Sequence, residues 1–385
     1  MHVASTPEQE DLRAELRRYF AALLTPERRA ALGSGSGEYG DGSVYRDVVR
    51  QMGADGWLVL GWPKEFGGQQ RSAADQLVFA EEAAVAGAPV PFLTLNTIGP
   101  TIMRFGTPEQ QSFFLPRIAA GELHFSIGYS EPDAGTDLAA LRTRAVRDGD
   151  DYVINGQKMW TSLIDHADYV WLACRTDPDA ARHRGLSILI VPTDAPGFSW
   201  TPVRTMAGVT TSATYYSDVR VPRTALVGEE NRGWGLITNQ LNHERVALTG
   251  AAPLFSALHA VLEWARETGA LDQEWVRVHL ARVHAKAEAL KLMNWRIAAA
   301  ATDAGPAEAS ATKLYGTELS TEAYRLLMEV LGPAATVRDG SPGAVLGGRI
   351  ERMQRSALIL TFGGGTNEVQ RDMIAATALG LPFRR

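Results

Sequence analysis

Apolar residues recur at helical spacing through the first and last thirds of the chain. Near the amino terminus, Leu12, Leu16 and Phe20 lie four positions apart, as on one face of an amphipathic helix. Two longer segments with helical periodicity follow late in the chain, at 271–294 and 306–331. Because such faces must be buried against other elements, the pattern predicts two groups of packed helices.

Between His124 and about Asn231 the pattern changes to that of strands. Short β-rich runs at 187–192, 198–203 and 215–222 are separated by Pro, Gly and Asp. Helices, then strands, then helices again predict a mainly α protein with a central β-subdomain.

A chain of 385 residues is longer than one ordinary core supports. We therefore expect three packed parts: an N-terminal helical domain over 1–121, a middle β domain over 122–231 and a C-terminal helical-bundle domain over 232–385.

Charge and composition exclude several classes of function. The formal charge is −6 and no run of Lys or Arg stands out, so a nucleic-acid or anionic-membrane partner has no electrostatic support. The amino terminus lacks the regions of a signal peptide, and no window is apolar over the length that spans a bilayer. We expect a cytoplasmic protein without a metal site. The single cysteine, Cys174, lies in an apolar run and is expected in the core.

The stretch 125–162 carries the candidate chemistry. Its first half is predicted as a strand that breaks into the loop Ser-Glu-Pro-Asp-Ala-Gly-Thr-Asp. In that loop, Gly135 and Thr136 offer backbone N–H groups and a hydroxyl to an anion.

The second half is predicted as a hairpin with Asn155-Gly156 as its turn, which delivers Trp160 and Ser162 on one strand. An indole beside a hydroxyl suits a flat, hydrogen-bonding heterocycle such as a flavin. For the hairpin alone, a buried Trp at a sheet edge explains the pattern better.

The two halves together resemble the signature of the acyl-CoA dehydrogenase family, whose Ser-Glu-Pro-x-Ala-Gly-Thr-Asp and Gln-Lys-x-Trp-x-Ser segments hold FAD. The similarity runs nearly end to end and implies the family fold: an N-terminal helical domain, a middle β-barrel-like domain and a C-terminal four-helix bundle. By this resemblance, the cofactor is contacted by Tyr129, Ser130, Gly135, Thr136, Trp160, Ser162, Thr366 and Glu368.

The implied reaction removes a proton from Cα and a hydride from Cβ of an acyl thioester, so it needs a base. Many family members carry the base as the glutamate of a Tyr-Glu-Gly-Thr segment, where this chain has Gly364. A variant of the family places it on an earlier helix, and Glu244 matches that position, with Arg245 as a substrate-binding neighbour. The loss at one position and the gain at the other favour Glu244.

Other interpretations of these carboxylates stay open. A Glu-Arg pair on a helix is most often a solvated or salt-bridged pair. Glu131 and Glu368 qualify as bases by residue type, but Glu131 precedes proline and is expected to hold the loop.

The segment around Gly364 can still serve the reaction, although it lacks the glutamate that other family members carry there. The thioester oxygen gains negative charge as the proton leaves, and the resemblance implies that the Gly364 N–H stabilises it, while Thr136 contacts the substrate. Three successive glycines also leave space for a bulky acyl group.

Two segments that clamp a neighbour's FAD in homotetrameric members are altered here. The segment 264–273 lacks Phe-Gly, and the segment 329–333 has Glu for Gln and Pro for Gly. The chain is therefore most similar to the α subunits of actinobacterial α2β2 acyl-CoA dehydrogenases of steroid side-chain degradation. This similarity implies a second dehydrogenase-like subunit, a substrate of the 3-oxocholest-4-en-26-oyl-CoA type and an electron-transfer acceptor.

Two rival functions remain compatible with the sequence. A flavin oxidase or monooxygenase could use the same scaffold with oxygen as the electron acceptor. A non-catalytic partner subunit would keep the fold without the chemistry, and the residues Glu244, Trp160 and Ser162 argue against it.

Overall fold

The computed structural model describes residues 5–32, 42–247, 249–300 and 305–382, and within 241–247 it describes only the course of a helix. The stretch 33–43 is rich in Gly and Ser, a composition that predicts a loop, and it lies largely outside these ranges. The helices are α1 (Pro7–Leu23), α2 (Pro26–Leu32), α3 (Gly42–Ala54), α4 (Ala73–Ala86), α5 (Gly99–Phe105), α6 (Pro108–Ala119), α7 (Gly233–Ala247), α8 (Ala252–Glu267), α9 (Glu274–Ala300), α10 (Pro306–Leu331), α11 (Arg349–Ala357) and α12 (Asn367–Leu379). The strands are β1 (Phe125–Gly128), β2 (Arg144–Asp148), β3 (Asp151–Lys158), β4 (Tyr169–Arg175), β5 (Leu186–Pro192), β6 (Phe198–Arg204), β7 (Thr210–Pro222) and β8 (Leu226–Val227).

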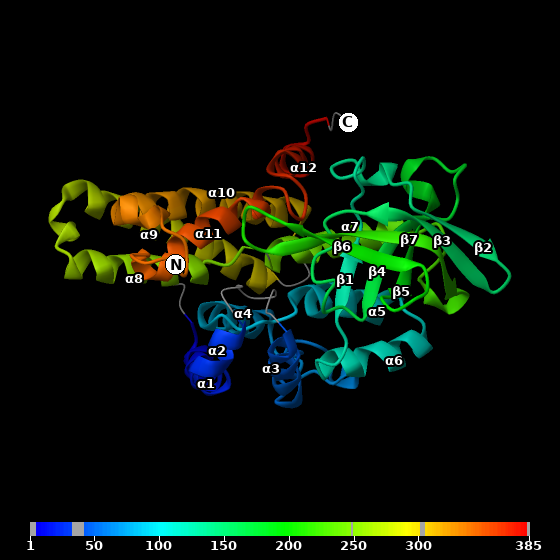
Figure 1. Ribbon diagram of the computed structural model, residues 1–385, viewed down its shortest axis with the longest axis horizontal. Coiled ribbons are helices and arrows are strands. Elements are labelled where there is room, and N and C mark those ends of the chain that lie inside the picture. The colour runs from blue at the N-terminus through cyan, green and yellow to red at the C-terminus, as the bar shows by residue number, and fades with distance from the viewer. Residues whose placement is uncertain (1–4, 33–41, 248, 301–304, 383–385) are drawn as a thin grey trace.

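These elements form three blocks (Figure 1). Helices α1 to α6 lie beneath the sheet and the C-terminal helices, and the sheet lies to one side of the long helices α8 to α10. The predicted fold class, mainly α with a central β-subdomain, is confirmed.

Helix starts in the N-terminal block follow the sequence closely. Thr6 and Thr107 each cap a helix with the hydroxyl, while the third helical residue, Gln9 or Gln110, returns a bond to the cap N–H. Ser72 caps α4 through the N–H of Asp75. These caps fix where the helices begin, and Leu12, Leu16 and Phe20 are buried on one face of α1, as predicted.

The strands form one sheet in the order β6-β7-β3-β2-β4-β5-β8, with β1 added in parallel to β4. The central strand β4 is almost wholly buried. Its Cys174 is buried too, and this burial raises the pKa of the thiol to about 12. The prediction of a core cysteine is confirmed.

The predicted turn at Asn155-Gly156 is wrong. These residues lie inside β3, where the register against β7 shifts between Ile154 and Gly156. The hairpin with β2 turns instead around Gly149, whose φ is 63°. At the bulge, the Asn155 amide exchanges hydrogen bonds with Asp218 across the strands, so the Asn-Gly pair forms an irregularity rather than a reversal.

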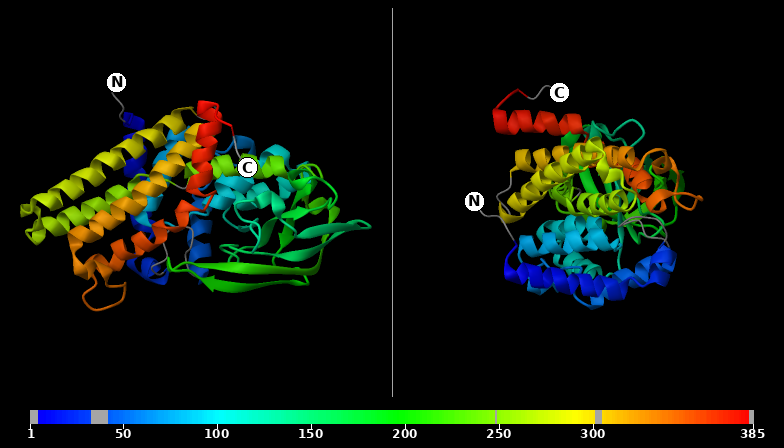
Figure 2. Two further views of the ribbon diagram at one scale, coloured as in Figure 1. Left: turned by 90° about the horizontal axis from the view of Figure 1, so that it is seen from above. Right: turned by 90° about the vertical axis from the view of Figure 1, so that its left-hand side faces the viewer.

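Helix α10 is the centre of the C-terminal block. It packs against α7, α8, α9, α11 and α12. The long helices α8, α9 and α10 lie side by side in Figure 2, and α4 of the N-terminal block covers α8 and α9. The bundle thus has one shared internal helix and contacts the N-terminal block directly.

The hairpin of β6 and β7 joins the sheet to the bundle. Arg355 of α11 donates to the Met206 carbonyl at the hairpin tip, and Ser356 donates to Ala207. Glu351, one turn earlier on α11, accepts two hydrogen bonds from the same guanidinium. These bonds hold the middle and C-terminal blocks together near the end of α11.

Candidate functional site

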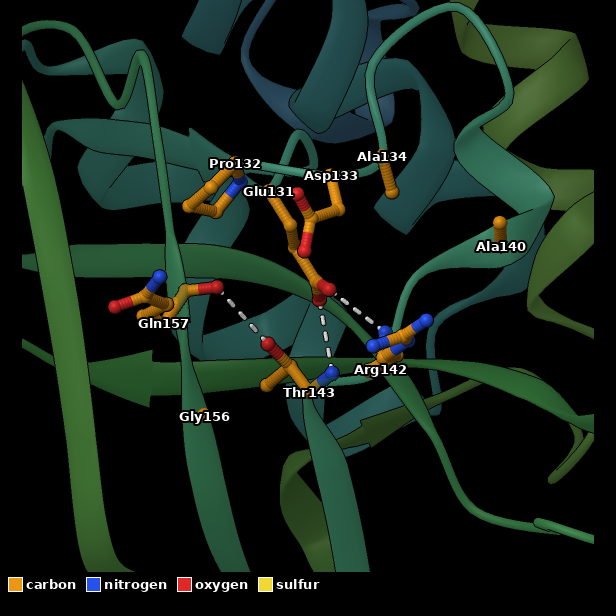
Figure 3. A pocket seen from close by; sticks show the side chains of 9 residues that line it. All are labelled: Glu131, Pro132, Asp133, Ala134, Ala140, Arg142, Thr143, Gly156 and Gln157. Atoms are coloured by element: carbon orange, nitrogen blue, oxygen red, sulfur yellow. Dashed lines mark hydrogen bonds between the residues drawn. The ribbon is translucent and has the colours of Figure 1, made fainter.

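The loop that follows β1 is built around one carboxylate. In this Glu131 loop (residues 129–143), the Glu131 carboxylate accepts from the N–H groups of Arg142 at 2.7 Å and Thr143 at 2.8 Å (Figure 3). The Lys158 ammonium lies 2.8 Å from the same carboxylate. The prediction that Glu131 holds the loop is confirmed.

Lys158 connects this loop to the end of β3. It is fully buried and donates to the Tyr129 carbonyl at 3.0 Å as well as to Glu131. The next residue, Met159, donates its N–H to the Ser130 carbonyl at 2.8 Å. The two halves of the predicted motif, far apart in sequence, therefore meet through the contacts of Lys158 and Met159.

Burial and charge act in opposite directions on Glu131. Burial by itself would raise the pKa of its carboxyl, but the Lys158 ammonium and the donors at Thr143 outweigh that effect and hold the pKa below its ordinary value. Glu131 is therefore ionised and serves as a structural anion, which leaves the role of base to another residue.

Trp160 and Ser162 do not lie on a strand, so that prediction is wrong. Strand β3 ends at Lys158. Thr161 is buried and donates its N–H to Ser212 on β7 at 2.9 Å. With Lys158 and Thr161 both fixed inside, the backbone between them takes a left-handed turn at Trp160, where φ is 65° and the residue is 58% exposed.

The Ser162 hydroxyl lies against β7. It shares a hydrogen bond of 3.0 Å with the Thr211 hydroxyl, and the Ser162 carbonyl accepts from Ser126 at 2.7 Å. The surface beside β3 thus presents an indole and a positioned hydroxyl, although through a turn rather than through strand alternation.

A cavity of about 200 Å³ lies between the Glu131 loop and β3. Figure 3 shows Glu131 at its centre, with the dashed bonds that run from its carboxylate. Gly135 and Thr136 are exposed at the outer bend of the loop, and no atom lies within 4 Å of where a Gly135 side chain would begin. The cavity is lined by Glu131, Pro132, Asp133, Ala134, Ala140, Arg142, Thr143, Gly156 and Gln157.

Tyr129 also connects the Glu131 loop to the C-terminal block. Its buried hydroxyl donates to the amide oxygen of Gln240 on α7. Gln240 is 1% exposed, and its amide nitrogen is buried without a hydrogen-bond partner among the described residues. Position 244 follows one helical turn later on α7.

Glu244 and Arg245 are on α7, as the sequence predicted, but their side chains lie outside the described residues. Their assignments as base and substrate contact stay predictions. The structure shows that position 244 lies on helix α7, and that Gln240 of this helix contacts Tyr129 in the Glu131 loop.

The segment 362–366, called the glycine loop here, precedes α12 and contacts α10. Gly364 and Gly365 have φ values of 67° and 95°, which L-residues with side chains rarely adopt. Two side chains donate to the carbonyl oxygens of this loop. Lys313 of α10 donates to the Gly365 carbonyl at 2.8 Å, and Gln370 of α12 donates to the Gly364 carbonyl at 3.3 Å. Within the described part of the chain, no protein group accepts from the Gly364 N–H.

Thr366 and Glu368 begin α12. The Thr366 hydroxyl caps the helix by accepting from the Val369 N–H, and Glu368 is exposed in the first turn. Asn367 is buried and accepts from Lys313 at 2.9 Å. No hydrogen bond of the described residues joins this segment to residues 129–162, so the predicted cofactor contacts fall into two groups.

Sequence reasoning missed four residues that position these loops: Lys158, Gln240, Lys313 and Gln370. Lysine and glutamine are usually exposed, and periodicity alone does not mark a buried polar residue. The one signal present was Lys158 itself, which lies within the Gln-Lys-x-Trp segment.

Membrane spans and metal clusters are not found among the described residues. Over these ranges, no helix has both the length and the apolar character needed to cross a membrane. No group of three or more His, Cys, Asp or Glu side chains in the same ranges could hold a metal ion.

The chain belongs to the acyl-CoA dehydrogenase family. Models of the family's N-terminal, middle and C-terminal domains match residues 6–122, 126–220 and 231–379. Over 99% of both chains it is 69% identical to "Acyl-CoA dehydrogenase FadE26" of Mycobacterium tuberculosis.

Solved structures extend this similarity to the whole fold. The chain is 68% identical, with a TM-score of 0.94 over 100% of both chains, to a chain of the crystal structure of the ChsE4-ChsE5 complex from Mycobacterium tuberculosis. It is 51% identical, with the same TM-score and coverage, to a chain of "Tcur3481-Tcur3483 steroid ACAD". The family membership makes the chain an oxidoreductase of the acyl-CoA dehydrogenase type.

Proposed function

We propose that this chain is the catalytic subunit of an FAD-dependent acyl-CoA dehydrogenase, with Glu244 as the base that removes the α-proton. The observation that carries the proposal is the hydrogen bond from Tyr129 to Gln240, because it joins the Glu131 loop to the helix that bears Glu244. A base and a ring-binding surface must be adjacent if proton and hydride leave neighbouring carbons.

The residues present fit a flavin. Trp160 is held outward on a left-handed backbone and offers an exposed indole face for stacking. The Ser162 hydroxyl is a hydrogen-bonding group suited to a polar ring edge. FAD, when bound, supplies the acceptor for the hydride that leaves Cβ. In this proposal Tyr129, Ser130, Gly135, Thr136, Thr366 and Glu368 complete its contacts.

The remaining steps fall to protein groups. A carboxylate at Glu244 becomes a stronger base when substrate binding excludes water around it, since burial disfavours the charged form. The Gly364 N–H donates to the thioester oxygen as negative charge develops there, and Lys313 fixes the glycine loop that presents it. Thr136 and Arg245 contact the CoA moiety.

We propose a bulky steroid side-chain thioester, of the 3-oxocholest-4-en-26-oyl-CoA type, as the substrate. Three adjacent glycines at 363–365 leave the acyl side of the loop without side chains. Similarity to Tcur3481-Tcur3483, a steroid ACAD with a chain 51% identical to this one, supports the same substrate class.

We also propose an α2β2 assembly with a second dehydrogenase-like subunit, and an electron-transfer protein as the acceptor. Glu329 replaces the glutamine that clamps a neighbour's cofactor in homotetramers. Its carboxylate is already engaged within the chain by His279 at 2.9 Å and by Arg325. Pro333 offers no N–H. Similarity to a chain of the ChsE4-ChsE5 complex, which pairs two proteins, supports a partner of this kind.

The test is co-expression with the second subunit, followed by anaerobic mixing with the steroid thioester. We expect about one flavin per two chains, and bleaching of the flavin band on mixing. Glu244→Gln should slow bleaching by about 10²–10⁴-fold, the usual contribution of a positioned base. Glu263→Gln, at an exposed position of α8, is the control and should bleach normally.

Other outcomes would overturn parts of the proposal. Normal bleaching in Glu244→Gln would remove the base assignment. Reduced flavin that is reoxidised faster by air than by an electron-transfer protein would indicate an oxidase. Flavin bound by this chain alone in full amount would contradict the shared assembly.

A further inference from the structure

Gln240 lies where two blocks of the molecule meet. The hydroxyl of Tyr129, at the end of β1, donates to the Gln240 amide oxygen, and the carbonyl of Tyr129 accepts from the buried Lys158 at 3.0 Å. Tyr129 is thus fixed to β3 through its backbone and to α7 through its side chain. Gln240 is the residue of α7 that makes this connection.

The amide nitrogen of Gln240 presents an unpaired donor. Its oxygen is used by Tyr129, which fixes the orientation of the amide group and directs the nitrogen away from that bond. The nitrogen is buried and has no hydrogen-bond partner among the described residues. Burying an amide donor without a partner is unfavourable, so native proteins seldom retain one without a use.

The position of this donor on α7 indicates that use. Residues four apart on a helix lie on the same face, so position 244 is the next along the face that carries Gln240. Under the proposed function, this face meets the reacting thioester and the flavin. Both molecules carry carbonyl oxygens that accept hydrogen bonds.

We infer that Gln240 is a ligand-binding and positioning residue: its amide oxygen holds Tyr129, and its amide nitrogen donates to a carbonyl oxygen of the molecule bound beside α7. This inference rests on the proposed function and adds to it a residue that the sequence analysis did not name as part of the site. The shared chemistry is a carbonyl acceptor, which belongs either to the flavin ring or to the acyl thioester.

The experiment uses the co-expressed complex and the variants Gln240→Met, Tyr129→Phe/Gln240→Met and Thr238→Val. Methionine keeps the volume of glutamine and removes the donor. The double variant also removes the hydroxyl that would otherwise lose its partner. Thr238 is exposed on the same helix, and its hydroxyl donates to the carbonyls of Trp234 and Gly235 within one turn, so Thr238→Val is the matched control.

Three quantities are measured: flavin affinity with its visible spectrum, the Kd of a 3-thia analogue of the steroid thioester, and the Tm of the flavin-free protein. The analogue has sulfur in place of Cβ and cannot react, so its binding is readable without turnover. Loss of one hydrogen bond should weaken binding about tenfold. Weaker analogue binding with an unchanged flavin spectrum assigns the acceptor to the thioester, whereas weaker flavin binding with a shifted spectrum assigns it to the flavin.

A structural role would give a different pattern. If Gln240 serves a ligand, the double variant keeps the Tm of the flavin-free protein, since both partners of the internal bond are replaced by apolar groups. Binding of flavin and analogue within twofold of wild type in Gln240→Met would overturn the inference. If Glu244→Gln blocks bleaching while the Gln240 variants bind normally, only this inference falls. If Glu244→Gln bleaches normally, the proposed base falls and the Gln240 binding data still stand.

Discussion

The Glu131 loop lies in the middle block and the glycine loop lies in the C-terminal block, and a fully buried lysine supports each of them. In the Glu131 loop, Lys158 meets a carboxylate, so the buried charge has a charged partner. In the glycine loop, Lys313 donates to the Gly365 carbonyl and to the Asn367 amide oxygen. Both lysines act on backbone carbonyls and thereby fix the path of the chain.

The two loops differ in the groups that they offer to a ligand: side chains in the Glu131 loop and a backbone N–H in the glycine loop. The Glu131 loop is fixed by side chains, and its ion pair determines where Tyr129 and Ser130 lie. The three glycines 363–365 of the glycine loop carry no side chains, and the Gly364 N–H has no protein partner among the described residues. Similar cations thus support a side-chain surface in one case and a backbone donor in the other.

The largest expected effect comes from breaking the charged support. Glu131→Gln strands the Lys158 ammonium in the interior, which should lower the free energy of unfolding by roughly 3–5 kcal/mol. Asp148→Asn, which breaks the exposed pair with Arg220, is the control and should cost less than about 1 kcal/mol. Urea unfolding of both variants gives the comparison, and equal losses would show that burial does not distinguish the two pairs.

Removing Lys313, which supports the glycine loop, should have a smaller effect on stability. Lys313→Met leaves the Gly365 carbonyl and the Asn367 amide without this donor, at a cost of about 1–3 kcal/mol. Turnover should fall further than stability suggests, because the Gly364 N–H loses its fixed position. Lys291→Met on α9, where the lysine pairs with Glu288 at the surface, is the control. Wild-type turnover in Lys313→Met would show that this lysine does not support the reaction.

The smallest effect is expected on mild acidification. The pKa of Glu131 lies below its ordinary value in the folded protein, so its contribution to stability is complete above the pKa of the unfolded chain and is lost as pH falls through the folded pKa. Stability should change little from pH 7 to 5 through this group and then decline. Urea midpoints across this range test it, and Glu131→Gln should show a shallower acid decline than wild type.

Much of the fold was predictable from local signals. The caps at Thr6 and Thr107 mark helix starts, and Pro306–Leu331 is helical over the predicted range. The apolar runs of the middle block became β5, β6 and β7. These features depend on neighbours in sequence, which periodicity and capping describe well.

The failures occurred where tertiary contacts override local preference. Asn155-Gly156 has the composition of a tight turn, yet the cross-strand amide bonds to Asp218 make it a bulge. Trp160 departs from strand geometry because Lys158 and Thr161 are drawn into the interior on either side. Buried polar residues such as Gln240 and Lys313 have no periodic signal, since their partners lie far away in sequence.

The position of α10 at the centre of the C-terminal block affects how the chain can fold during translation. Every other helix of the C-terminal block packs on it, and α4 of the N-terminal block covers α8 and α9. A ribosome must therefore complete Pro306–Leu331 before α7, α8 and α9 can find their common neighbour. Until then the face of α4 that meets α8 and α9 stays uncovered, so this protein is expected to need chaperone protection from early in translation until α10 is complete.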